Sequence, residues 1–445
     1  MLSMNKTRMI TVLCVLLAVV FALTGCTTFN NFKEAFIDPP DTRTDTIDIG
    51  VYEPMTGPSK EDAKAELSGI ELAHDAMPEI DGREVRLIYA DTSSTIEAAE
   101  TAINTLIAKK PSVILGSYGA LFSLTAGEHI AEAQIPSIAI TNTNPLVTRN
   151  NSFYFRVCYV DASQGRLLAH YLNSIGEKSA GILLPSKDDA ATAMATAFTN
   201  ELSTLTDNDD AIAFHEEYTT GDTNFTRVLR KLKNADVKSV LLPGDMNDAA
   251  SIIRQANDMG LQIRFLGPTN WGSEEFLTAI STNSDSTPAT PIDPDHLAFV
   301  QFFASDGTDD TDDTISEARE MFLDAYHKKY GKKQDPEDAV ALGYDAYGIA
   351  IDAVLKAEEL EATAPEATAA ADATDAEDAD AEDAADSRPS GEAIRSVLAD
   401  STYEFDGASG VIRFNKRGDP KKTAFISTWN QGAITSIYTI EADEQ

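Results

Sequence analysis

The sequence predicts an α/β protein with two doubly wound lobes, in which parallel strands are covered on both faces by helices. First, short apolar runs alternate along the chain with longer segments of helical periodicity, which is typical of parallel sheets. Second, 445 residues with 43% hydrophobic side chains are more than a single core usually serves. Third, polar loops follow the apolar runs, at the places where ligands bind in such sheets.

Strands and helices are expected in alternation over the first part of the chain. The apolar runs that we interpret as strands cover 47–52, 84–90, 112–116, 136–140 and 180–184. Helical patterns lie between them at 65–77, 97–108, 123–133 and 164–174. Because strands joined through a helix lie parallel, this order predicts a crevice beyond their carboxyl ends.

The N-terminus predicts export and lipidation. Lys6 and Arg8 precede an apolar run at 9–23, a pattern typical of a secretory signal peptide, which we place at 1–25. The run is shorter than the ~20 apolar residues that span a membrane, and it ends in Leu23-Thr24-Gly25-Cys26, which resembles the bacterial lipobox. We therefore expect an extracytoplasmic protein, anchored to the cell membrane by lipid on Cys26 and followed by a flexible tether through residue 45.

The charge of the chain argues against nucleic acid as a partner. The formal net charge is −37, which disfavours contact with phosphate backbones. Part of this excess lies at 357–387, where acidic residues stand among alanines with no basic residue, and we expect a disordered insertion there. A second acidic run at 306–313 lacks the glycine and the ligand order of a calcium loop, so calcium binding is a minor alternative.

Three polar loops are candidates for ligand contact. They cover 53–58, 117–120 and 141–145, and each follows a predicted strand. Hydroxyl groups and free N–H groups at helix starts can hold a carboxylate. Ordinary turn and capping chemistry explains the same Gly, Pro, Asn and Thr residues equally well. No single loop therefore distinguishes a ligand site from an ordinary turn.

A series of short motifs runs in a fixed order along the chain. Among them are Met55-Thr56-Gly57-Pro58, Asp161-Ala162-Ser163-Gln164-Gly165, Phe265-Leu266-Gly267-Pro268 and Ala341-Leu342-Gly343-Tyr344-Asp345. Together they resemble the leucine/isoleucine/valine-binding branch of the type I periplasmic binding proteins, from about residue 47 to 437 except in the acidic insertion. The resemblance implies a solute-binding protein of an ABC importer, a monomer that hands an amino acid or a related small amine or amide to permease subunits.

The resemblance also implies how the chain is divided. Lobe 1 would comprise 46–158 and 305–422, and lobe 2 would comprise 159–304 and 423–445. Three strands would cross between the lobes near 157–162, 302–306 and 421–424, and the lobes would close over the ligand as a hinge.

In the resembled family, groups of the first lobe hold the carboxylate of an amino-acid ligand. These positions and their neighbours fall on Tyr118, Gly119, Ala120, Thr141, Asn142 and Thr143. Ala120 keeps a backbone N–H but lacks the hydroxyl that the family often places there. The acidic group that receives the ammonium falls on Thr269, near Trp271, and threonine carries no charge.

Aspartates replace aromatic residues of the family's cleft. They are Asp62, Asp189 or its neighbour Asp188, and Asp245. Carboxylates in a desolvated cleft favour a cationic ligand through charge-assisted hydrogen bonds. The alternative is that these aspartates face solvent, as most do in an acidic protein.

Several function classes lack sequence support. No Cys-x-x-Cys pair, His-Glu-x-x-His helix, Gly-x-Ser-x-Gly elbow or phosphate-binding loop is found, and we expect neither an enzyme nor a cofactor. The six histidines lack metal spacing, so no metal site is inferred, and Cys158 alone remains after processing, so no disulfide is expected. A sensor that presents its ligand to a receptor and a lipoprotein that regulates cell-wall synthesis remain alternative functions.

Overall fold

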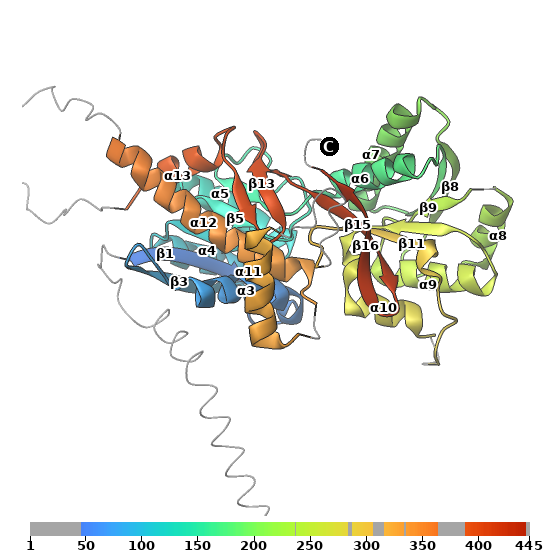
Figure 1. Ribbon diagram of the computed structural model, residues 1–445, viewed down its shortest axis with the longest axis horizontal. Helices are drawn as coiled ribbons and strands as arrows, with labels where there is room; N and C mark the ends of the chain where they lie inside the picture. The colour runs from blue at the N-terminus through green and yellow to red at the C-terminus, as the bar shows by residue number, and fades with distance from the viewer. Residues whose placement is uncertain are drawn as a thin grey trace, which may run out of the picture.

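The structure is a computed structural model that describes residues 46–235, 237–283, 287–305, 316–332, 335–363 and 388–441. The predicted signal peptide, Cys26, the tether, the acidic run at 306–313 and most of the acidic insertion lie outside these residues. Within the described segments, no helix is long and apolar enough to cross a membrane. Figure 1 shows two α/β bodies side by side, each with its own sheet.

The first sheet is parallel except at one edge. Its strand order among the described residues is β2-β3-β1-β4-β5-β6. The strands are β1 (Thr46–Glu53), β2 (Glu79–Ile80), β3 (Arg83–Asp91), β4 (Val113–Gly116), β5 (Ser137–Ala139) and β6 (Tyr154–Arg156). Every residue of the central strand β1 is buried, because helices cover both faces of the sheet, and this explains its continuous apolar run.

Helices from distant parts of the sequence cover this sheet (Figure 1). They are α3 (Lys60–Ala76), α4 (Ile96–Ile107), α5 (Ala120–Ala133), α11 (Glu317–Tyr330), α12 (Asp338–Thr363) and α13 (Gly391–Leu398). Helices α3 and α12 cross closely at Gly69 and Gly343, since a Cβ on Gly69 would lie 2.1 Å from the Val340 carbonyl oxygen. A small antiparallel sheet packs beside them, with β12 (Phe405–Gly407), β13 (Gly410–Phe414) and β14 (Pro420–Lys421).

The second sheet has a parallel centre and an antiparallel hairpin at one edge. Its strand order in the described part of the chain is β16-β15-β11-β10-β9-β7-β8. The strands are β7 (Ala180–Pro185), β8 (Ile212–Tyr218), β9 (Ser239–Leu241), β10 (Arg264–Gly267), β11 (Leu297–Gln301), β15 (Ala424–Asn430) and β16 (Ala433–Ile440). The accompanying helices are α6 (Asp161–Ser174), α7 (Asp189–Thr206), α8 (Thr226–Asn234), α9 (Met246–Asp258) and α10 (Glu274–Ser281).

Three connections join the two bodies. The chain passes from β6 to α6 through 157–160, leaves β11 at 302, and passes from β14 to β15 through 422–423. The described residues of these connections stand outside the assigned strands, and the Val157 N–H still donates to the carbonyl oxygen of Ala139 in β5 at 3.0 Å. Most of their side chains are buried, and the rings of Tyr159 and Phe302 lie 5.6 Å apart. The lobe boundaries stay a prediction.

The α/β class and the early alternation of strands and helices are confirmed. The acidic insertion, in contrast, begins later than residue 357, because α12 continues to Thr363. Two physical reasons account for this: Ala357 is fully buried against the core, and Arg83 forms an ion pair with Glu358 at 2.7 Å. Ala, Glu and Leu also favour the helix intrinsically.

Candidate functional site

A cavity of about 380 Å³ lies between the two bodies, at the carboxyl ends of both sheets' strands. It is lined by α3 and the loops after β4 and β5 on one side, and by α6, α7 and the loops after β9 and β10 on the other. The start of α12 and the end of β11 complete its wall. This is the crevice position expected for parallel sheets.

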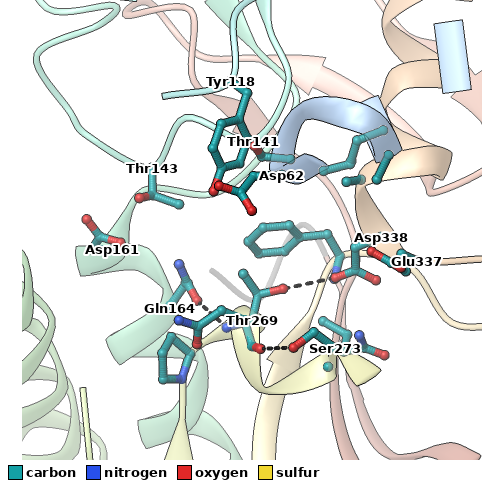
Figure 2. Close-up of a pocket in the computed structure, with 18 of the residues that line it drawn as sticks. Asp62, Tyr118, Thr141, Thr143, Asp161, Gln164, Thr269, Ser273, Glu337 and Asp338 are labelled. Carbon is teal, nitrogen blue, oxygen red and sulfur yellow. Dashed lines mark hydrogen bonds between the residues drawn. The ribbon is translucent and has the colours of Figure 1, made fainter. Parts of the chain in front are cut away.

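Five residues that the sequence singled out line this cavity. They are Asp62, Tyr118, Thr141, Thr143 and Thr269 (Figure 2). Asp62 lies in the first turn of α3, and Thr269 directly follows β10. The structure thus brings together residues that are more than 200 positions apart in the sequence.

Four other candidates are not among the residues that line the cavity. Gly119 and Ala120 form the start of α5. Asn142 is buried, and its side chain donates to Ser117 O and Ser123 Oγ. Trp271 is fully buried and stacks on Phe276 with ring centroids 4.8 Å apart, so it belongs to the core of the second body.

Asp189 and Asp245 also lie outside the lining of this cavity, and their contact with a ligand stays a prediction. Both are exposed and stand at helix starts, Asp189 as the first residue of α7 and Asp245 as the cap of α9. The Asp245 carboxylate accepts the backbone N–H groups of Asn247 and Asp248 at 2.8 and 3.1 Å. Capping explains its presence without a ligand.

The cavity is nevertheless acidic, through carboxylates that the sequence analysis mostly missed. Its acidic lining residues are Asp62, Glu66, Asp161, Glu337 and Asp338. None of the described lining residues is Lys, Arg or His. In a partly dry site such a lining favours cations and disfavours anions.

Glu53 and Glu66 form a buried pair at the inner wall of the cavity. Both side chains are fully buried, Glu53 at the end of β1 and Glu66 on the inward face of α3. The Tyr118 N–H donates to Glu53 Oε2 at 2.8 Å, and the Thr141 hydroxyl donates to Glu66 Oε1.

The remaining oxygens of the pair, Glu53 Oε1 and Glu66 Oε2, are buried and have no hydrogen-bond partner among the described residues. A hydrogen bond between the two carboxyl groups would satisfy both oxygens, and it requires a proton on one of them. Burial raises the pKa of Glu53 well above its usual value, and the charge of Glu66 raises it further. Burial likewise raises the pKa of Glu66, to about 7.

Gly116, the last residue of β4, makes room for this pair. A Cβ at this position would lie 2.4 Å from Glu53 Oε1 and 2.3 Å from the Tyr52 carbonyl oxygen. Its φ of +104° is also one that L side chains rarely adopt. The close approach therefore requires glycine.

Asp338 links the two bodies at the other side of the cavity. Its Oδ2 accepts the Thr269 hydroxyl at 3.0 Å and the Phe302 N–H at 2.7 Å. The Thr269 N–H in turn donates to Gln164 Oε1 at 2.9 Å (Figure 2). Burial raises the pKa of Asp338 to about 6, although these two hydrogen bonds oppose the change.

Asp161 makes a second link. It is the first residue of α6, and the Thr143 hydroxyl of the first body donates to its carboxylate. Its backbone N–H donates to Thr143 O at 3.3 Å. Burial raises the pKa of Asp161, and the bond from Thr143 opposes the increase.

The sequence matches the periplasmic binding protein family over residues 46–433. It is similar to an amino acid binding protein of Pseudomonas aeruginosa, with 26% identity over 52% of this chain and 62% of that protein. The chain thus spans a little under two thirds of that relative. A leucine-, isoleucine-, valine-, threonine- and alanine-binding protein of the same species is 23% identical over 87% of this chain and 91% of its own length.

Solved structures share the fold. A leucine-binding protein of Thermotoga maritima superposes with a TM-score of 0.67 at 23% identity, over 90% of this chain and 100% of that chain. A Rhodopseudomonas palustris solute-binding protein in complex with benzoate gives 0.62 at 16% identity, over 88% and 96%. Relatives of this kind are solute-binding proteins and not enzymes, which agrees with the missing catalytic motifs.

Proposed function

This chain belongs to the periplasmic binding protein family, and we propose that it captures a small polar solute in its interlobe cavity and delivers it to an ABC importer. Proteins of this family are extracytoplasmic. The solute class that we propose is an amino acid or a related small amine or amide. The chain would act as a monomer that meets permease subunits in its ligand-bound form.

The interlobe cavity is the observation that carries this proposal. Groups from both bodies line it, and the links Thr143 to Asp161 and Thr269 to Asp338 join the bodies across it. Three short connections are a suitable hinge for opening and closing. Its volume of about 380 Å³ falls within the ~300–1,000 Å³ that small-molecule sites usually have.

We further propose that the protein is held at the membrane by lipid on Cys26. The charged start, the apolar run at 9–23 and the motif Leu23-Thr24-Gly25-Cys26 support this. Mass spectrometry of the protein from its native membrane tests it. The expected result is an N-terminal peptide that starts at an acylated Cys26, and a Cys26→Ser variant should lose the membrane fraction.

Thermal unfolding against a panel of amino acids, amines, amides and short peptides tests solute capture. A ligand that binds only the folded state raises the melting temperature by mass action, so one compound class should give a clear upward shift. No shift across the whole panel would contradict solute capture and favour a protein partner, as in the cell-wall alternative.

A further inference from the structure

Several polar groups of the cavity are arranged to accept hydrogen bonds, beside phenol and amide donors of Tyr118, Asn270 and Gln301 that also line it. The hydroxyls of Thr141, Thr143 and Thr269 all line it. Their hydrogen bonds go to carboxylates, from Thr141 to Glu66, from Thr143 to Asp161 and from Thr269 to Asp338. Because a hydroxyl has one proton to donate, each threonine presents only lone pairs to a ligand. The three hydroxyls therefore extend the acceptor surface of the carboxylates.

The Glu53–Glu66 pair occupies donors that a ligand's carboxylate would need. The start of a helix is a favourable place for an anion, because its N–H groups are free. Here the Tyr118 N–H, which lies just before the Gly119 cap of the 14-residue helix α5, already donates to Glu53, and the nearby Thr141 hydroxyl donates to Glu66. A carboxylate on the ligand would therefore lose these two donors and would lie among acidic oxygens.

The acidic groups surround the cavity from different directions. Figure 2 shows Asp161 on one side, Glu337 and Asp338 on the opposite side, and Asp62 above and between them. Apolar side chains, including Met194 and Leu342, line the same cavity. An aliphatic chain with an ammonium group at each end matches this arrangement better than a single charge does.

We propose that the ligand of this site is an aliphatic diamine or longer polyamine without a carboxylate, and that Glu66 is a specificity-determining residue. This inference rests on the proposed function, because it takes the interlobe cavity as the solute site. It goes further by naming the chemical class of the solute. It also excludes the α-amino acids for which several relatives are named.

Titration calorimetry with 1,5-diaminopentane and lysine tests the proposal, because lysine is the same diamine with a carboxylate added. We expect 1,5-diaminopentane to bind and lysine to bind at least about tenfold more weakly, since its carboxylate would be desolvated among acceptors. Lysine binding as tightly as the diamine would overturn the inference. Binding of leucine alone would also overturn the inference, but it would agree with solute capture. No binding by any amine or amino acid would contradict solute capture itself.

Three variants separate the site from the general charge of the protein. Glu66→Gln keeps a hydrogen-bonding side chain but removes the charge, and should weaken diamine binding at least about tenfold. Asp62→Asn removes an acid from the cavity mouth without touching the buried pair, and should also weaken binding. Asp189→Asn, an exposed position outside the lining, is the matched control and should change affinity less than about twofold. Equal losses in all three would overturn the role of the cavity acids.

Discussion

Replacing Glu66 by glutamine should change how the stability of the protein depends on pH. Burial raises the pKa of Glu66 from its usual 4.5 to about 7 in the folded protein. The folded state therefore favours the protonated carboxyl, and the associated stability is fully present below pH 4.5 and is lost as the pH rises through about 7. Glutamine resembles the protonated form at every pH, because its amide can donate to Glu53 while its oxygen accepts from Thr141.

The size of this effect follows from the pKa of Glu66. The increase from 4.5 to about 7 corresponds to about 3 kcal/mol, at about 1.4 kcal/mol for each pH unit. At pH 5 the variant and the wild type should thus differ by no more than about 1 kcal/mol. At pH 8 the unfolding free energy of the variant should exceed that of the wild type by up to about 3 kcal/mol, relative to the difference at pH 5. Removal of the Glu66 charge, which repels a charge on Glu53, should increase this difference further.

Urea unfolding of both proteins without ligand, at pH 5, 6, 7 and 8, measures this difference. Comparison with the wild type at each pH removes the pH-dependent contribution of the carboxyl groups that the two proteins share. Glu53→Gln, which imitates the protonated partner, should show the same trend with pH. A difference in unfolding free energy that stays constant from pH 5 to 8 would refute the shared proton and the raised pKa.

Three further predictions concern packing, capping and the buried thiol. Gly69→Ala places a Cβ 2.1 Å from the Val340 carbonyl oxygen and should lower the unfolding free energy by about 1–3 kcal/mol, measured by urea unfolding. Asp245→Ala removes the cap of α9 and should cost about 1 kcal/mol in the same assay, with the thermal shift given by a bound ligand unchanged. Burial raises the pKa of Cys158 to about 12, so iodoacetamide should label this thiol only after unfolding. Mass spectrometry measures the labelling, and rapid labelling of the native protein would contradict the burial of Cys158.

The sequence predicted the sheets well because their signal is local and strong. Buried parallel strands are continuous apolar runs, and the run at 47–52 corresponds to β1, whose residues are all buried. The loops after such strands must meet at one edge of the sheet. For this reason the loop of Thr141 and Thr143 could be expected at the cavity without coordinates, whereas Thr269 was expected there from the family resemblance.

The aspartates were harder to place, because the same residue type serves two purposes at a helix start. Asp62 lines the cavity, whereas Asp245 caps its own helix and Asp189 is exposed. Capping is a local interaction and contact with a cavity is a tertiary one. The sequence alone does not separate them.

Glu66 had a sequence signal that was overlooked. It shares one helix face with Ala63, Ile70 and Ala73, all of which are buried. An acidic residue on an apolar face is rare unless it has a partner. Its partner Glu53 ends a strand 13 positions earlier, and only the packing of α3 against the end of β1 shows that the two carboxyl groups meet.

Proton release on ligand binding tests the central claim most directly. A cation in the cavity should favour the ionised forms of Glu66 and Asp338, whose pKa values are raised to about 7 and about 6. Four further carboxyl groups face the same region, those of Glu53, Asp62, Asp161 and Glu337. Titration calorimetry of 1,5-diaminopentane at pH 6.5, in buffers of different ionisation enthalpy, counts the protons released. The account predicts net release and an affinity that rises from pH 5.5 to 8. Binding without proton release, or tighter binding at the lower pH, would contradict a cavity that captures cations through its buried carboxylates.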